Sequence, residues 1–232
     1  MMCDTREHVA SVCLISYGPS LRDLCAHRLQ MVVNYLKLGR WMARQGFEVG
    51  RRLPDRTAVF DAVAAKVRER DVLYLEFGVY KGASMRYWSK ALRHPAAHLD
   101  GFDSFDGLPE DFDINGPIVR ETFRVDGQVP TIDDPRVRFI KGWFEDTLPS
   151  YQVPAHDVLV MCLDADLYSL TRFVLDRFQP WIKRGTFIYF DDMSRPEHEP
   201  RAFQEFMAKT GLHFTPVAAD RSLNTVFFEC LG

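Results

Sequence analysis

Four aspartates follow two strongly apolar segments of this sequence, and carboxylates in such numbers can bind a cation or take up a proton. Asp164 and Asp166 end the first segment, and Asp191 and Asp192 end the second. Asp164 and Asp166 are two residues apart, so an extended backbone points both to the same side. Crowded carboxylates repel one another, which a hard divalent cation such as Mg²⁺ or Ca²⁺ would relieve. Helix capping by these aspartates is an equally open interpretation.

A turn with two glycines precedes these aspartates, within the run LEFGVYKGAS at 75–84. It follows an expected strand and opens an expected helix, so Gly78 and Gly82 let the backbone approach a ligand near free helix N–H groups. The Gly-x-x-x-Gly spacing differs from the G-x-G-x-x-G of dinucleotide binders. Glu76 would repel a pyrophosphate and suits a positively charged ligand, such as an amino group or a sulfonium. An ordinary strand-to-helix turn is an equal alternative.

Further candidate residues follow other expected strands. The carboxylate of Asp103 can accept two hydrogen bonds from a ribose diol. Alternatively, Asp103 forms a simple turn, which the segment Asp-Ser-Phe-Asp-Gly at 103–107 favours. Trp143 and Phe144 could form a wall against a purine or pack in the core. His198, Glu199 and Arg201, which follow Arg195 and Pro196, could contact a substrate, although a polar helix start is the favoured alternative.

Expected strands alternate with expected helices from residue 72 onward. Strands are expected at 72–77, 98–103, 137–140, 157–164, 185–191, 213–217 and 225–229, and helices at 83–93, 167–182 and 200–209. This alternation indicates an α/β fold with a mainly parallel sheet covered on both faces. Because ligands bind beyond the carboxyl ends of such strands, the acids there should meet at one edge. Residues 104–135 are expected to be a long loop over the site.

The first sixty residues are expected to be helical. Apolar residues from Leu21 to Leu36 share one helical face, and Gly39 is the expected C-terminal stop. Residues 46–55 are expected to be a connector, because they carry Gly, Pro and Arg. A second helix is expected to start near Thr57.

Composition restricts the class of protein. The 232 residues, 47% hydrophobic and 26% charged, are typical of a soluble globular domain. The formal net charge of -3 argues against nucleic acid as the main partner. Five cysteines without a CxxC pair fit a reducing cytoplasm better than a disulfide framework. No apolar run approaches the roughly 18 residues of a membrane span, so no membrane association is expected.

Taken together, these residues resemble a class I S-adenosylmethionine-dependent methyltransferase, and more narrowly the macrocin O-methyltransferase family. The matching segments are LEFGVYKGAS at 75–84, DSFDGLPEDF at 103–112, GWFEDTLP at 142–149, LDADLYS at 163–169 and FIYFDDM at 187–193. The resemblance implies a Rossmann-like seven-stranded, mostly parallel sheet whose last strand is antiparallel. It also implies a helical N-terminal extension over residues 1–55, as an acceptor lid or dimer contact, before a methyltransferase domain over residues 56–232.

The resemblance also implies a role for each candidate residue. The cofactor would contact Glu76, Gly78, Tyr80, Gly82 and Ser84 with its methionine part, Asp103 and Ser104 with its ribose, Gly142, Trp143 and Phe144 with its adenine, and Asp164. Asp164, Asp191 and Asp192 would bind Mg²⁺ or another hard divalent cation, and Asp166 would be the general base. The implied reaction is metal-assisted methylation of a small-molecule hydroxyl on a sugar or glycosylated natural product, by a cytoplasmic homodimer.

Three alternative functions stay open on the sequence alone. A catechol-type metal-dependent O-methyltransferase acting on an aromatic diol would use the same carboxylates with an aromatic acceptor pocket. A nicotinamide-dependent oxidoreductase is disfavoured by the missing G-x-G-x-x-G motif. A non-catalytic binding module on the same fold is disfavoured by the complete set of carboxylates.

Overall fold

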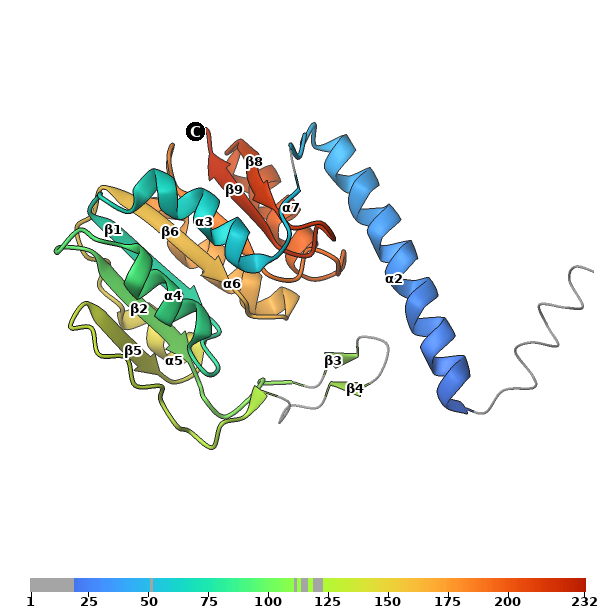
Figure 1. Ribbon diagram of the computed structural model, residues 1–232, viewed down its shortest axis with the longest axis horizontal. Coiled ribbons are helices and arrows are strands. Elements are labelled where there is room, and N and C mark those ends of the chain that lie inside the picture. The colour runs from blue at the N-terminus through green and yellow to red at the C-terminus, as the bar shows by residue number, and fades with distance from the viewer. Residues whose placement is uncertain (1–18, 51, 111, 114–116, 119–122) are drawn as a thin grey trace, which may run out of the picture.

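A seven-stranded sheet forms the centre of the computed structural model, which describes residues 19–50, 52–110, 112–113, 117–118 and 123–232 (Figure 1). The parallel strands are β1 (Val72–Phe77), β2 (His98–Asp103), β5 (Val137–Lys141), β6 (Val158–Leu163) and β7 (Phe187–Phe190). The last strand, β9 (Val226–Cys230), runs antiparallel between β7 and β8 (Phe214–Ala219). The order β5-β2-β1-β6-β7-β9-β8 confirms the expected Rossmann-like sheet with an antiparallel last strand.

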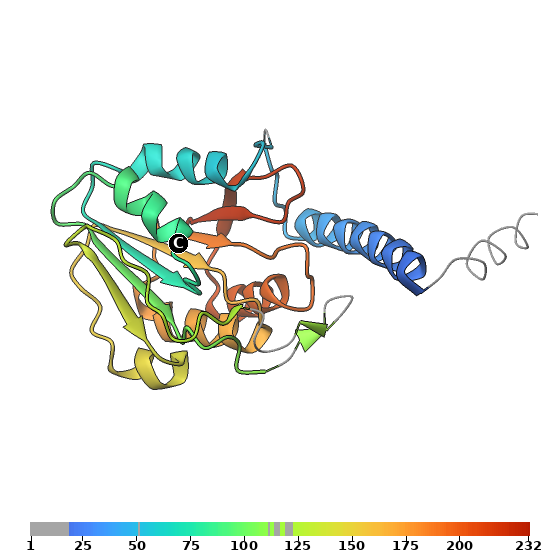
Figure 2. The same cartoon turned by 60° about the horizontal axis from the view of Figure 1, so that its bottom comes forward.

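Helices cover both faces of the sheet, which gives the three layers visible in Figure 2. One face carries α3 (Arg56–Val67) and α4 (Ala83–Ala91); the other carries α5 (Phe144–Thr147), α6 (Tyr168–Phe178) and α7 (Glu199–Thr210). Alternation along β1 explains why both faces are covered. Tyr74 packs in the core cluster under α3 and α4, whereas Leu75 packs in the opposite cluster. Every residue of β1 is buried, as in central strands of parallel sheets.

Short elements complete the chain. They are the two-residue strands β3 (Phe112–Asp113) and β4 (Pro117–Ile118) and the 3₁₀ helices η2 (Leu148–Ser150) and η3 (Gln179–Trp181). The helix expected over residues 167–182 ends at Phe178, because Pro180 lacks the N–H that an α-helix would require and the chain tightens into η3. Within the loop expected over residues 104–135, the described residues include the short antiparallel β3–β4 pair.

The prediction that the first helix stops at Gly39 is wrong, because α2 (Pro19–Arg44) continues through this residue. A Cβ atom at Gly39 would meet no atom within 4 Å. An exposed glycine inside a helix costs only about 1 kcal/mol of stability. Burial of the nearby Leu38 and Met42 offsets this cost. Gly46, with a positive φ of 70°, follows the observed end of the helix.

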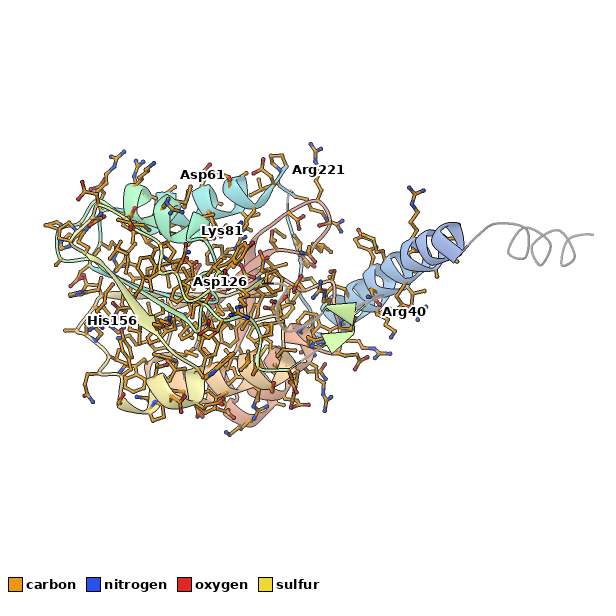
Figure 3. The ribbon with its side chains drawn as sticks, turned by 90° about the horizontal axis from the view of Figure 1, so that it is seen from below. Arg40, Asp61, Lys81, Asp126, His156 and Arg221 are labelled. Carbon is orange, nitrogen blue, oxygen red and sulfur yellow. The ribbon has the colours of Figure 1, made fainter. Side chains whose placement is uncertain are left out.

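The C-terminal half of α2 packs against the rest of the described structure. Leu38 and Met42 are buried there, and the indole Nε1 of Trp41 donates to Oε1 of Gln204 in α7 at 2.9 Å. Arg40, which is labelled in Figure 3, lies in this C-terminal half, and the N-terminal part of α2 projects from the densely packed body. None of the helices in the described part of the chain has the length and apolar character needed to cross a membrane.

Candidate active site

A cavity of about 340 Å³ opens at the carboxyl ends of the parallel strands. It is lined by the turns after β1, β5, β6 and β7, by the longer loop after β2 and by the start of α3. The five aspartates expected to meet at this edge all line it: Asp103, Asp164, Asp166, Asp191 and Asp192. This gathering follows from parallel strands, whose carboxyl ends share one edge of the sheet.

The turn between β1 and α4 approaches the end of β6 very closely. A Cβ atom at Gly78 would lie 1.9 Å from the carbonyl oxygen of Asp164, and Gly78 has a φ of 94°. Both facts require a glycine at this position. The N–H of Gly78 donates to the carbonyl of Phe102 at 3.0 Å, which ties the same turn to β2.

Asp103 holds this turn in place through backbone contacts. Its Oδ2 accepts hydrogen bonds from the N–H groups of Val79 and Tyr80, each at 2.7 Å, and its Oδ1 accepts one from Phe105 at 2.6 Å. A carboxylate has about four acceptor positions, so these three bonds leave capacity for a ligand hydroxyl. Ser104 lines the cavity beside it and donates its hydroxyl to the carbonyl of Gly107 at 3.0 Å.

Two arginines cross-link the four remaining aspartates. Nη2 of Arg56 lies 2.8 Å from Oδ2 of Asp164, and its Nε lies 3.4 Å from Oδ1 of Asp191. Arg195 makes the second cross-link: its Nη1 lies 3.2 Å from Oδ2 of Asp192 and 3.6 Å from Oδ1 of Asp166. Each guanidinium therefore joins one carboxylate that follows β6 to one that follows β7.

Two guanidinium groups do not balance the charge of four ionised aspartates. Burial, reinforced by the charge of Asp191, raises the pKa of Asp164 to about 7. Burial and the nearby Asp192 raise the pKa of Asp166 to about 9. Full ionisation of this wall at neutral pH therefore needs further positive charge, which a sulfonium or a divalent cation would provide.

The backbone of Asp166 differs from the sequence-based expectation. We expected an extended backbone from Asp164 to Asp166, but Asp166 has a φ of 59°, in the left-handed region. Both side chains still line the cavity, because the chain turns there before α6. Helix capping by Asp166 is also wrong: the N-cap of α6 is Leu167, and no side chain caps it. Tyr80, with a φ of 51°, is a second left-handed residue lining the cavity.

The other candidate residues divide between the cavity and the layer behind it. Tyr80, Gly142, Trp143 and Phe144 line the cavity, together with Gly78, Asp103, Ser104 and the four aspartates after β6 and β7. Glu76, Gly82 and Ser84 do not line it. Gly82 is the N-cap of α4, and Ser84 is buried in that helix.

Glu76 lies in a buried network inside β1. It is 2% exposed and accepts a hydrogen bond from the hydroxyl of Tyr74 at 2.7 Å. Burial raises its pKa from 4.5 to about 8, although the bond from Tyr74 opposes this shift. The folded chain therefore holds a proton on Glu76 at pH values where the unfolded chain has lost it.

Replacing Glu76 by glutamine should weaken the dependence of stability on pH. The wild-type free energy of unfolding falls as pH rises from about 5 to about 8, because ionisation is favourable only in the unfolded chain. Glutamine cannot ionise, and its carbonyl can still accept from Tyr74. Urea denaturation of both proteins at about pH 5 and about pH 8.5 measures the effect. We expect the variant to gain relative stability at the higher pH, and an equal difference at both values would contradict the shifted pKa.

The sequence did not indicate Arg56 as a site residue. It directly follows the segment interpreted as a connector, and an isolated arginine carries no motif. The structure makes it the first residue of α3, since Asp55 caps that helix by accepting from the N–H of Ala58 at 2.9 Å. The apolar lining formed by Leu108, Phe123 and Leu170 was also missed, because two of these residues lie in a loop without periodicity.

A model of the macrocin-O-methyltransferase (TylF) family matches residues 47–228, which include every side chain of this site. The chain belongs to this family. Membership in the macrocin-O-methyltransferase family confirms the resemblance inferred from the five segments. It also favours methyl transfer over the nicotinamide-dependent alternative.

Curated relatives agree with this assignment, and a solved structure shares the fold. The chain is 33% identical to 8-demethyl-8-(2,3-dimethoxy-alpha-L-rhamnosyl)-tetracenomycin-C 4'-O-methyltransferase of Streptomyces olivaceus, over 51% of each chain. It is 29% identical to mycinamicin III 3''-O-methyltransferase of Micromonospora griseorubida, over 51% of this chain and 52% of the relative. The chain thus spans about half the length of these relatives. The calicheamicin methyltransferase CalS11 shares the fold, with 17% identity, a TM-score of 0.57, and coverage of 98% of this chain and 94% of that chain.

Proposed function

We propose that this chain is an S-adenosylmethionine-dependent O-methyltransferase acting on a hydroxyl of a sugar or glycosylated natural product. The observation that carries the proposal is the cavity in which the Gly78 turn and Asp103 face a wall of four aspartates. Family membership supports methyl transfer. The names of the tetracenomycin and mycinamicin relatives support a glycosylated acceptor.

The residues of the cavity fit the cofactor. Gly78 leaves space that any Cβ atom would fill, and Asp103 retains acceptor capacity for a ribose hydroxyl. Trp143 and Phe144 provide apolar surface for a purine. When bound, S-adenosylmethionine supplies a methyl group on a positively charged sulfur, whose charge the aspartate wall would stabilise. Glu76, Gly82 and Ser84 would act from behind the turn by fixing its shape.

Asp166 is the proposed general base. Its carboxylate lines the cavity and lies on the acid wall, 11% of its side chain being exposed. It would accept the proton of the acceptor hydroxyl at a carboxylate oxygen while the cavity walls hold that hydroxyl in line with the methyl group. Burial and the nearby Asp192 raise the pKa of Asp166, so added positive charge beside it would favour the ionised form that acts as a base.

We also propose that a hard divalent cation binds at the aspartate wall. Among the described residues, no group of three or more Asp, Glu, His or Cys side chains is already arranged so that it could hold a metal ion. The donors nevertheless suit Mg²⁺, because the ion pairs with Arg56 and Arg195 use one oxygen each of Asp164, Asp191 and Asp192. We propose that these three aspartates hold the cation through their other oxygens. A bound cation would lower the pKa of an acceptor hydroxyl.

Binding of S-adenosylhomocysteine, the product that the cofactor becomes after methyl transfer, tests the proposed class of enzyme. We expect S-adenosylhomocysteine to raise the melting temperature of the purified chain, since a ligand that binds only the folded state stabilises it by mass action. NAD is the matched comparison and should leave the melting temperature unchanged. Stabilisation by NAD and not by S-adenosylhomocysteine would sink the proposal. Methylation of a panel of glycosides and aromatic diols then separates the sugar acceptor from the catechol-type alternative.

Removal of divalent cations should reduce turnover strongly. With an accepted acceptor, we expect EDTA to lower kcat by at least about tenfold, and added Mg²⁺ should restore it. The variant Asp191→Asn should lose both the activity and the response to Mg²⁺. S-adenosylhomocysteine binding should persist in both cases, because Asp191 is assigned to the cation. Full turnover in EDTA would remove the metal from the proposal.

We further propose that the extension over residues 1–55 contacts a second copy of the chain. Four apolar residues of α2 form an exposed stripe at i, i+3, i+4 and i+7, with relative exposures between 44% and 66%: Leu29, Val32, Val33 and Leu36. On the opposite side of α2, Leu38 and Met42 are buried in the hydrophobic core of the same chain. Residues 24–44 contain four Arg or Lys residues and no Asp or Glu, whereas the whole chain has a net charge of -3. The charge of α2 therefore complements the more acidic remainder of a second copy.

Light scattering tests the homodimer. We expect twice the monomer mass for the wild-type chain and the monomer mass for Val32→Asp, which places a charge on the exposed stripe. A wild-type mass of one monomer would refute the contact. The methyltransferase domain over residues 56–232 should fold around the same cavity in either case.

The thiols of Cys162 and Cys230 are free, which supports our further proposal of a reducing, cytoplasmic location.

A further inference from the structure

Arg56 occupies a position that is fixed from two sides. It begins α3, whose first turn is capped by Asp55. Its guanidinium carbon lies 5.4 Å from the ring centre of Phe60 and 5.6 Å from that of Tyr189. Guanidinium groups stack on aromatic faces, so these rings restrict the movement of the side chain.

The contacts of Arg56 reach both strand ends that carry the aspartates. Nη2 donates to Asp164 at 2.8 Å, which is a strong charge-assisted hydrogen bond. The Nε contact with Asp191, at 3.4 Å, is an ion pair without hydrogen-bond geometry. Asp191 also accepts a hydrogen bond from the hydroxyl of Tyr189, one of the two rings beside Arg56. Arg56, Tyr189 and the two aspartates therefore form one connected unit.

We propose that Arg56 is a positioning residue: it sets the separation and orientation of the Asp164 and Asp191 carboxylates, which belong to different strand ends. The inference rests on the proposed function, in which these carboxylates hold a cation beside the acceptor. Two carboxylates repel each other when ionised, and a cationic group that contacts both offsets this repulsion and can keep them in a fixed relation. The planar guanidinium can contact two acids at once with defined geometry, whereas an ammonium acts as a point charge.

Arg56 could instead serve only as a counter-charge, and two substitutions separate the alternatives. Arg56→Lys keeps the positive charge and loses the planar fork, and Arg56→Met keeps apolar bulk and loses the charge. The matched control is Arg68→Met at the other end of the same helix, where Arg68 pairs only with the exposed Glu69 among the ion pairs that the structure describes. A counter-charge is retained in the lysine variant, but a positioning group is not.

Binding of Mn²⁺ alone, followed by electron paramagnetic resonance in the full chain, measures the effect on the proposed cation site. We expect both Arg56 variants to bind Mn²⁺ about 10–100-fold more weakly, the range for residues that orient metal ligands. Arg68→Met should bind as the wild type does. S-adenosylhomocysteine should still bind to every variant in calorimetry, which shows that the cavity is folded. Wild-type Mn²⁺ affinity in Arg56→Lys, or tighter binding in Arg56→Met, would overturn the proposal.

A crystal structure of Arg56→Lys decides the proposal independently of any metal. We expect the Asp164 and Asp191 carboxylates to shift relative to each other by more than about 0.5 Å, the tolerance of a preorganised site. Unchanged carboxylate positions contradict the positioning role. If the wild-type chain binds no Mn²⁺, the proposed cation site fails and this structural comparison alone decides the role of Arg56. If it binds no S-adenosylhomocysteine, the proposed function itself fails.

Discussion

Replacing Asp166 by asparagine should lower kcat by about 10²–10⁴-fold, the usual contribution of a general base. The amide has nearly the same shape as the carboxylate but cannot accept the proton of the acceptor hydroxyl. Asparagine tolerates the left-handed conformation that Asp166 adopts, with its φ of 59°, so the backbone should be preserved. Steady-state kinetics with an accepted glycoside, detected as released S-adenosylhomocysteine, measures the loss.

A matched control is available for this substitution. Asp126 is also an aspartate with a positive φ, 50°, but it is exposed and does not line the cavity. Asp126→Asn should retain wild-type kcat. Binding of S-adenosylhomocysteine should be unchanged in both variants. A loss of less than tenfold in Asp166→Asn would show that another group takes the proton.

Replacing Gly78 by alanine should destabilise the fold and abolish cofactor binding. The new Cβ would lie 1.9 Å from the carbonyl oxygen of Asp164, far inside van der Waals contact, and the φ of 94° is strained for any residue with a side chain. Left-handed strain and overpacking together suggest a loss of about 2–5 kcal/mol in the free energy of unfolding. The turn after β1 would also move away from the end of β6, so these two walls of the cavity would separate.

Urea denaturation measures this loss, and calorimetry with S-adenosylhomocysteine measures the binding. Gly39→Ala is the control, because Gly39 lies in an exposed stretch of α2 where the added methyl group would meet no atom within 4 Å. It should stabilise the chain by about 0.5–1 kcal/mol through helix propensity alone. Equal effects of the two substitutions would show that the close approach at Gly78 is unimportant.

The sheet could be predicted from the sequence because its signals are local and repeated. Apolar segments alternate with helical ones from residue 72 onward, and this pattern determines the class of fold. The parallel order then brings Asp103, Asp164 and Asp191 to one edge without any knowledge of side-chain contacts. The predictions for the aspartates at strand ends therefore agreed with the structure, whereas Glu76, also expected at this edge, is buried inside β1 and does not line the cavity.

Details that depend on tertiary contacts could not be predicted in this way. Gly39 was expected to end a helix, but burial of Leu38 and Met42 on the body outweighs the local preference. The left-handed backbone of Asp166 follows from the turn into α6, which periodicity does not report. Arg56 reaches the site across 108 positions of sequence to Asp164, and no spacing rule spans such a distance.

The cavity draws its walls from the beginning of α3, from the β1 turn and from the loops after β2, β5, β6 and β7. The lining residues are spread from Arg56 to Arg195, so a partly folded chain that lacks any of these elements presents no complete binding surface. Ligand occupancy should consequently protect the elements that line the cavity against proteases, because an opening that separates these elements also removes part of the binding surface. Cellular abundance of this protein would then rise and fall with the supply of its small-molecule ligand.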